Sequence, residues 1–172
     1  MLVPAIVRAL RQPPFLADDF TATRFATAED KAAFGNELMR FIAADFPQGR
    51  WNERLYRRLS NCFGHIAHCD RFGFYETCFT CHAHKVRFLR DTLRWVPCGD
   101  PHWTWCDIER TVMHRLHESG VLRFYEAADQ HEVEQIERAL LARLQEKYAP
   151  VPPPLRMPRD LLDAASQEML SR

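Results

Sequence analysis

The sequence has no excess of either charge, no long apolar run and none of the short motifs that identify common enzyme families. Its 23 basic and 23 acidic side chains cancel, which removes any argument from net charge for binding nucleic acid, anionic membrane or acidic substrate. No stretch approaches the roughly 18 apolar residues of a membrane span. The apolar start is interrupted by Pro4 and Arg8, which argues against a secretory signal. We therefore expect a cytoplasmic protein with no membrane association.

Common catalytic signatures are missing as well. The chain contains no G-x-x-x-x-G-K-[ST], G-x-G-x-x-G, G-x-S-x-G or H-E-x-x-H pattern. Nucleotide-binding, dinucleotide-binding, α/β-hydrolase and zincin classes therefore lose their usual support. The Glu-x-x-His pairs of di-iron bundles are also absent. These absences favour a non-enzymatic protein.

Apolar residues recur at helical spacing through most of the chain, and strand-like alternation is absent. Thr27 can cap a helix whose first turn holds Glu29 and Asp30, and Gly120 can close a later one. Two central runs, 51–69 and 75–93, are expected to pack as an antiparallel hairpin. The pattern predicts an all-α, single-domain bundle of about five to six helices with this hairpin at its centre.

The expected organisation has three parts. Residues 1–26 contain three prolines and form an N-terminal arm, residues 27–148 form the bundle, and residues 149–172 form a Pro-rich linker with a short C-terminal helix. The last run of the bundle, 121–148, is expected to bury one apolar stripe. That stripe consists of Val133, Ile136, Leu140 and Leu144.

Cysteine and histidine are concentrated in one region. All six cysteines and seven of the eight histidines lie between Cys62 and His117. In a reducing compartment such clusters indicate metal binding, catalysis or simple burial rather than disulfides. Spacings of three and four residues let two neighbouring helices present zinc ligands to each other. The candidate ligands are Cys62, His65, Cys78, Cys81 and His82, with Cys69 as a substitute.

Three other interpretations of this cluster stay open. The cysteines can be small buried core residues beside surface histidines. Cys78, Cys81 and His82 can instead serve a metal-dependent or Cys-dependent enzyme. The same residues match C-x-x-C-H, the attachment signature of c-type haem. No single one of these chemistries is required by the spacing.

The stretch from Arg50 to Arg94 contains nine basic residues and only four acidic ones. They can form a phosphate-binding face or a merely solvated one. The candidate nucleic-acid contacts are Arg54, Arg57, Arg58, Lys85, Arg87 and Arg90. A protein partner could instead bind the Trp-containing loop near Trp103 or the Pro-rich tail. Our leading hypothesis is a cytoplasmic helical protein that binds protein or nucleic acid and is stabilised by zinc.

Overall fold

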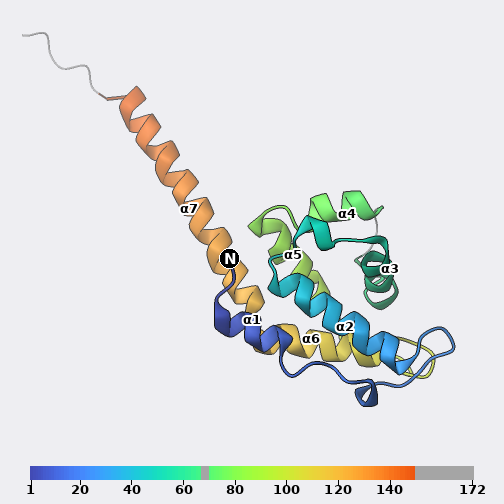
Figure 1. Cartoon of the computed structure of the whole chain (residues 1–172). Helices are drawn as coiled ribbons and strands as arrows, with labels where there is room; N and C mark the ends of the chain where they lie inside the picture. The colour runs from blue at the N-terminus through green and yellow to red at the C-terminus, as the bar shows by residue number, and fades with distance from the viewer. Residues whose placement is uncertain (67–69, 150–172) are drawn as a thin grey trace, which may run out of the picture. The chain divides into compact units, whose positions relative to one another are not determined.

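The computed structural model describes residues 1–66 and 70–149, and all regular structure in these ranges is helical (Figure 1). The predicted all-α class is therefore confirmed. The described residues form seven α-helices and two short 3-10 helices. The elements are α1 (Pro4–Arg11), η1 (Ala17–Asp19), α2 (Ala28–Ala43), η2 (Gln48–Arg50), α3 (Glu53–Cys62), α4 (Arg71–Cys78), α5 (His82–Leu93), α6 (Cys106–Ser119) and α7 (Val121–Lys147).

Two predicted helix ends are confirmed by their capping contacts. The Thr27 hydroxyl accepts a hydrogen bond from the Asp30 backbone amide at 3.1 Å, and the Asp30 carboxylate accepts from the Thr27 amide in return. This reciprocal pair satisfies amides at the start of α2 that have no partner within the helix. Gly120 ends α6 with a φ of +69°, a left-handed conformation that glycine adopts without steric cost.

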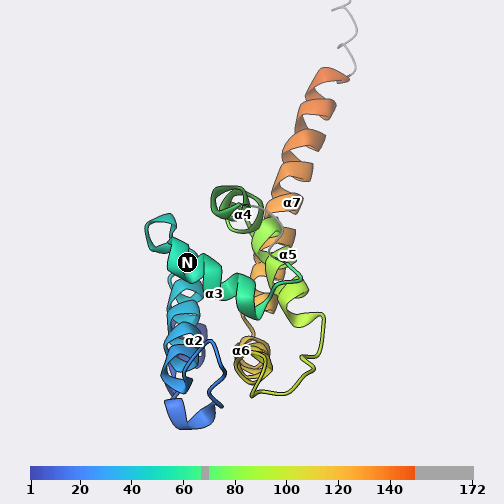
Figure 2. The same cartoon turned by 90° about the vertical axis from the view of Figure 1, so that its right-hand side faces the viewer.

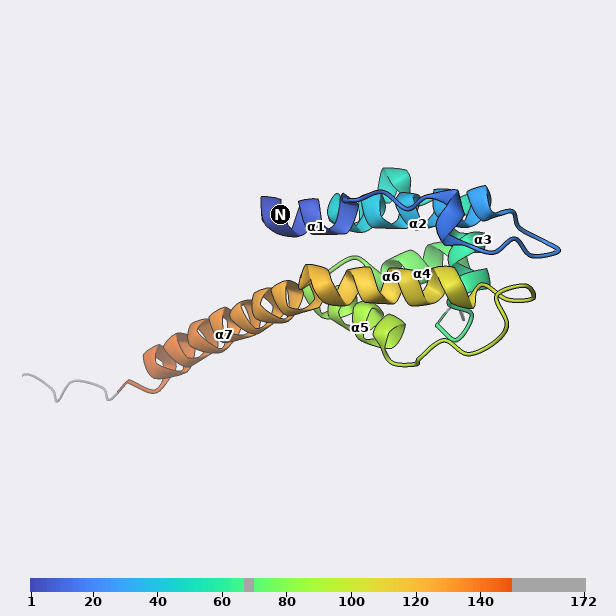
Figure 3. The same ribbon diagram turned by 90° about the horizontal axis from the view of Figure 1, so that it is seen from below.

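The helices α1, α2 and α6 contact one another and form one part of the bundle. Chain direction in α1 is opposite to that in α2 and α6 (Figure 3). Figure 2 shows α6 end on, with α2 beside it. Buried apolar side chains from all three helices join one core that extends into α3, α4 and α5.

Aromatic rings fill the part of this core beneath α4 and α5. Phe79 stacks on Phe46 with ring centroids 4.9 Å apart. It also meets Phe88 and Trp51 edge to face at 4.9 and 5.1 Å. Such pairs contribute about 0.5–1.5 kcal/mol each beyond their buried area. Phe79 therefore fixes the junction between α4 and α5 at the centre of the core.

The central helices differ from the predicted hairpin in their boundaries. The expected turn at 71–73 lies inside α4, because the Asp70 carboxylate caps the amides of Phe72 and Gly73 at 2.8 and 3.0 Å. The run expected to be continuous over 75–93 is divided between α4 and α5. Cys81 begins α5 as its N-terminal cap residue. The hairpin is thus built from three short helices instead of two long ones.

Residue contacts divide the chain into two compact units, 1–133 and 134–172. The expected arm belongs to the first unit, because Leu10, Phe15 and Phe20 are buried in its core. Most of the predicted linker and the whole predicted C-terminal helix fall in residues 150–172, outside the described residues. None of the described helices has the length and apolar character needed to cross a membrane.

The expected burial of the α7 stripe is wrong. Each of its side chains is exposed by more than two fifths of its surface, and the exposed residues are Val133, Ile136, Leu140 and Leu144. Helical spacing identified one apolar face correctly, but the side chains on that face are exposed. The periodicity of a sequence shows that a face is apolar and does not show which molecule buries it.

Candidate binding groove

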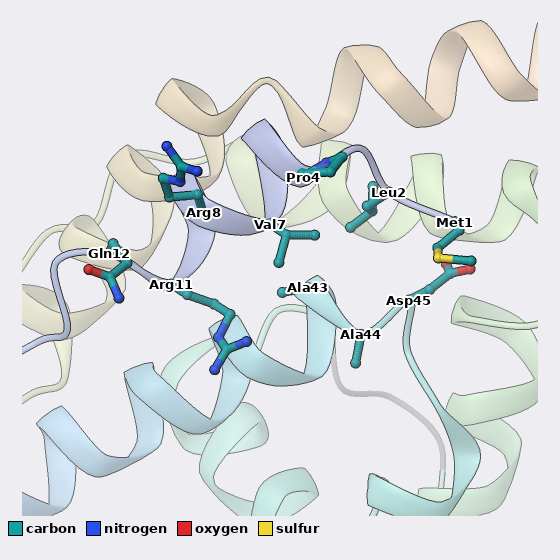
Figure 4. Close-up of a pocket in the computed structure, with 10 residues that line it drawn as sticks. All are labelled: Met1, Leu2, Pro4, Val7, Arg8, Arg11, Gln12, Ala43, Ala44 and Asp45. Atoms are coloured by element: carbon teal, nitrogen blue, oxygen red, sulfur yellow. The ribbon is translucent and has the colours of Figure 1, made fainter.

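A hollow in the described surface lies between α1 and the end of α2 (Figure 4). It has a volume of about 810 Å³, which falls within the usual range for ligand sites in proteins. Its lining is mainly apolar, with charged side chains from α1 and from Asp45, which follows the end of α2. The lining residues are Met1, Leu2, Pro4, Val7, Arg8, Arg11, Gln12, Ala43, Ala44 and Asp45.

The sequence of α1 explains why a short helix can form one wall of this groove. Pro4 occupies the first helical position, where its fixed φ favours the helix and its missing N–H is not needed. Leu10 is fully buried, and Ile6 and Val7 pack against the core. Arg115 of α6 anchors the end of this segment by donating to backbone carbonyls of Leu10 and Pro13.

Arg8 and Arg11 lie in the last turn of α1. They extend from the helix in different directions (Figure 4). Within residues 1–66 and 70–149, neither guanidinium makes an ion pair or a hydrogen bond. Two cationic groups without partners beside an apolar hollow favour a ligand that carries negative charge. A ligand reaching both must be larger than a single small anion.

Asp45 forms the other end of the groove and connects it to the core. Its Oδ1 atom accepts hydrogen bonds from Lys85 Nζ at 2.6 Å and from the Tyr125 hydroxyl at 2.7 Å. The Lys85 ammonium also lies 5.6 and 5.3 Å from the ring centres of Phe46 and Tyr125. Asp45 is therefore already neutralised inside the protein, and the other charged side chains that line the groove are Arg8 and Arg11.

The backbone at this corner is held in an unusual conformation. Asp45 and Phe46 have φ values of +68° and +55°, in the left-handed region that non-glycine residues seldom occupy. Such conformations cost about 1–3 kcal/mol and persist where surrounding contacts determine them. The paired carboxylate of Asp45 and the buried ring of Phe46 supply those contacts, which fixes the shape of the groove.

Burial and hydrogen bonding shift the pKa of the Asp45 carboxylate in opposite directions. Desolvation raises the pKa of Asp45, but the hydrogen bonds from Lys85 and Tyr125 and the Lys85 charge outweigh it, so the pKa lies below its ordinary value. Desolvation and the hydrogen bond to Asp45 raise the pKa of Tyr125. The tyrosine therefore stays protonated and remains a donor at neutral pH.

The sequence held one sign of this groove that was not used. Pro4 at a helix start, followed by Ile6, Val7 and Leu10, is a short amphipathic helical pattern. Three prolines within residues 1–26 led instead to the expectation of an N-terminal arm, in which a short helix was only one option and was not placed at a residue. The partner wall at Ala43 and Ala44 carries no chemical signature, so no sequence pattern could have placed it opposite α1.

Two of the proposed zinc ligands are engaged elsewhere. Cys62 is buried in the core, and desolvation, followed by the charge of Glu109, raises the pKa of its thiol well above the ordinary value. Zinc binds the thiolate, which this setting disfavours. The His65 Nε2 atom lies 3.1 Å from the backbone carbonyl oxygen of Asp91.

The other three proposed ligands lie where α4 gives way to α5. Cys78 ends α4, and Cys81 and His82 begin α5. The His82 Nδ1 atom lies 3.0 Å from a carboxylate oxygen of Glu132. Among residues 1–66 and 70–149, no three His, Cys, Asp or Glu side chains are gathered to hold a metal ion. Cys69 falls outside these ranges. Zinc binding stays a prediction that elemental analysis of the native protein tests.

A smaller hollow of about 330 Å³ lies beside Cys78, with Arg87 and Asp91 in its wall. Neither Cys81 nor His82 lines it. This hollow therefore contains only one of the three residues of the C-x-x-C-H sequence. An enzyme or a haem protein using these residues stays a prediction.

Most of the candidate nucleic-acid contacts already have partners within the protein. Arg87 donates to the Thr77 backbone carbonyl, and Arg54 is exposed. The other four form ion pairs, namely Arg57 with Glu53, Arg58 with Asp30, Lys85 with Asp45 and Arg90 with Glu126. These carboxylates cancel much of the local positive charge that the sequence suggested.

The Trp-containing loop between α5 and α6 is partly exposed. Trp95 and Trp103 present more than half of their surface to solvent, whereas Trp105 packs edge to face on Phe34 of α2.

Comparison of the chain with known protein families, curated proteins and solved structures finds no match. The geometry of the groove is therefore the main guide to function.

Proposed function

We propose that this chain is a non-enzymatic cytoplasmic protein that binds an acidic amphipathic segment of a partner protein in the groove between α1 and α2. The observation that carries the proposal is the pair Arg8 and Arg11, whose guanidinium groups have no partner within the described residues and border a mainly apolar hollow. A helix with apolar residues on one face and carboxylates beside them complements both features.

The remaining surface supports a protein partner over a nucleic acid. Nucleic-acid binding depends on several basic side chains free to neutralise phosphates. Four of the six candidates are paired with carboxylates of this chain. The five described cysteines are free thiols, which fits a reducing compartment.

The test uses a phage-displayed panel of helical peptides. In each peptide, Leu or Ile recurs every three or four residues, and either Glu or Lys occupies the flanking positions. We expect selection on the full chain to enrich the Glu peptides. Fluorescence anisotropy of an enriched peptide should show about tenfold weaker binding to the Arg8→Glu/Arg11→Glu variant, because two attractive charges become repulsive.

Arg54→Glu is the matched control, because Arg54 is an exposed arginine on α3 outside the groove. It should leave peptide binding unchanged. Equal selection of Lys peptides, or unchanged affinity of the Arg8→Glu/Arg11→Glu variant, overturns the proposal. Salt-dependent binding of labelled duplex DNA that Arg54→Glu weakens would also overturn it, in favour of the basic face.

A further inference from the structure

Apolar side chains form a continuous exposed stripe on the second half of α7. Ile136, Leu140 and Leu144 recur every four residues, so they lie along one face of the helix. Leu141 lies beside them. The exposed fractions of Ile136, Leu140 and Leu141 are 63, 54 and 56%. Large apolar side chains gathered on one exposed face indicate a surface that another molecule covers.

The charges of α7 are separated along the helix. Between residues 126 and 137 there are five acidic side chains and no lysine or arginine, whereas residues 138–147 hold three basic side chains and one acidic one. The acidic residues of the first segment are Glu126, Asp129, Glu132, Glu134 and Glu137, and the basic residues of the second are Arg138, Arg143 and Lys147.

We propose that the exposed stripe of α7 pairs with the same stripe of a second copy of this chain, with the two helices antiparallel. An antiparallel pair centred on Leu140 sets residues 133–137 of each copy, with two carboxylates, against residues 143–147 of the other, with two basic side chains and one carboxylate. A parallel pair sets like charges together. The antiparallel arrangement also places the two helix dipoles in opposite directions, which is electrostatically favourable. A two-fold axis at Leu140 places the two Leu140 side chains together and Ile136 against Leu144.

The stripe spans only nine residues, from Ile136 to Leu144, so the association is expected to be reversible and to depend on concentration. Sedimentation velocity of the full chain over a range of concentrations tests it. We expect a monomer–dimer equilibrium. Leu140→Glu should raise the dissociation constant at least tenfold, because it places a carboxylate of each copy in the apolar contact.

Ala142→Glu is the matched control. It adds the same side chain two residues away, at an exposed position on the opposite face of α7. Association should be unchanged. A full chain that stays monomeric at every concentration overturns the proposal, as does assembly into trimers or larger species. Equal effects of Leu140→Glu and Ala142→Glu also overturn it, because the contact would then not lie on the stripe.

A charge reversal tests the orientation separately. Arg143→Glu/Lys147→Glu makes most of the helix acidic. In an antiparallel pair the acidic segments then face acidic segments, so the dimer should weaken several-fold at low salt and less at high salt. In a parallel pair, like segments already face each other and only the sign of the repulsion changes. An unchanged dissociation constant would therefore exclude the antiparallel arrangement.

Discussion

Asp45 links the shape of the groove to the stability of the core. Its carboxylate neutralises Lys85, a lysine whose side chain is only 10% exposed. The same carboxylate accepts a hydrogen bond from the Tyr125 hydroxyl. The same residue adopts a left-handed φ at the end of α2. Without the carboxylate, a buried ammonium would lose its counter-charge. The chain would also lose the contact that holds this corner in place.

We expect Asp45→Asn to lower the free energy of unfolding by about 1.5–3 kcal/mol at pH 7, the cost of losing hydrogen bonds to a charged group. Because the native pKa of Asp45 is lowered, its contribution is fully present above the unfolded pKa of about 3.9. It is lost as the pH falls through the native value. Urea denaturation at pH 7 and below pH 4 should show the difference between wild type and variant narrowing in acid.

Asp18→Asn provides the comparison for this measurement. Asp18 is an exposed aspartate in η1, so its replacement should change the free energy of unfolding by less than about 0.5 kcal/mol. Equal effects of the two substitutions, or a cost of Asp45→Asn that grows as the pH falls, would contradict the assigned role of Asp45.

Helix boundaries set by local capping were readable from the sequence, and those set by tertiary contacts were not. Thr27 and Gly120 carry their signals within a few residues, and both were predicted correctly. The break between α4 and α5 follows from Phe79, whose ring is held by aromatic neighbours distant in sequence. No local sequence pattern predicts such contacts, so one continuous helix over residues 75–93 was expected.

The same break explains why the predicted ligand set is not gathered. The spacing argument placed Cys78 and His82 four residues apart on one helix, where they would share a face. In the structure Cys78 ends one helix and His82 begins the next, so the spacing no longer implies a shared face. Cys62, the expected ligand on the facing helix, is taken up by the core.

The contact between α2 and α6 depends on a fully buried lysine that the sequence did not reveal. Lys31 is 0% exposed and its Nζ lies 2.8 Å from a carboxylate oxygen of Asp107. It also donates to the backbone carbonyls of Pro101 and Thr104 at 3.2 and 3.3 Å. These contacts fix the loop before α6 against α2. The partners of Lys31 lie 70 to 76 residues away in the sequence, so no local pattern marks this lysine as buried.

Asp107→Ala should therefore destabilise the protein by about 3–5 kcal/mol, because it leaves an ammonium buried without its counter-charge. Replacing both partners, as in Lys31→Met/Asp107→Ala, removes the unpaired charge and should recover part of that loss. Urea denaturation of the two single variants and the double variant gives the coupling energy directly. Strictly additive effects would show that the pair is not energetically coupled.

The buried core of the chain ends well before the exposed stripe begins. Every member of the buried apolar cluster lies between Leu2 and Tyr125, and the contact pattern separates residues 134–172 as a unit of their own. The folding of the first unit and the proposed pairing of α7 are thus expected to be separable.

A chain ending at Glu137 tests the separation. It keeps one turn beyond residue 133 and lacks Leu140, Leu141 and Leu144. Pairing of folded copies stabilises them by mass action, so the thermal midpoint of the full chain should rise with protein concentration. The midpoint of the shortened chain should not. At low concentration, where both are monomers, calorimetry should give nearly equal midpoints. A large drop for the shortened chain even when dilute would mean that residues 138–172 stabilise the bundle itself.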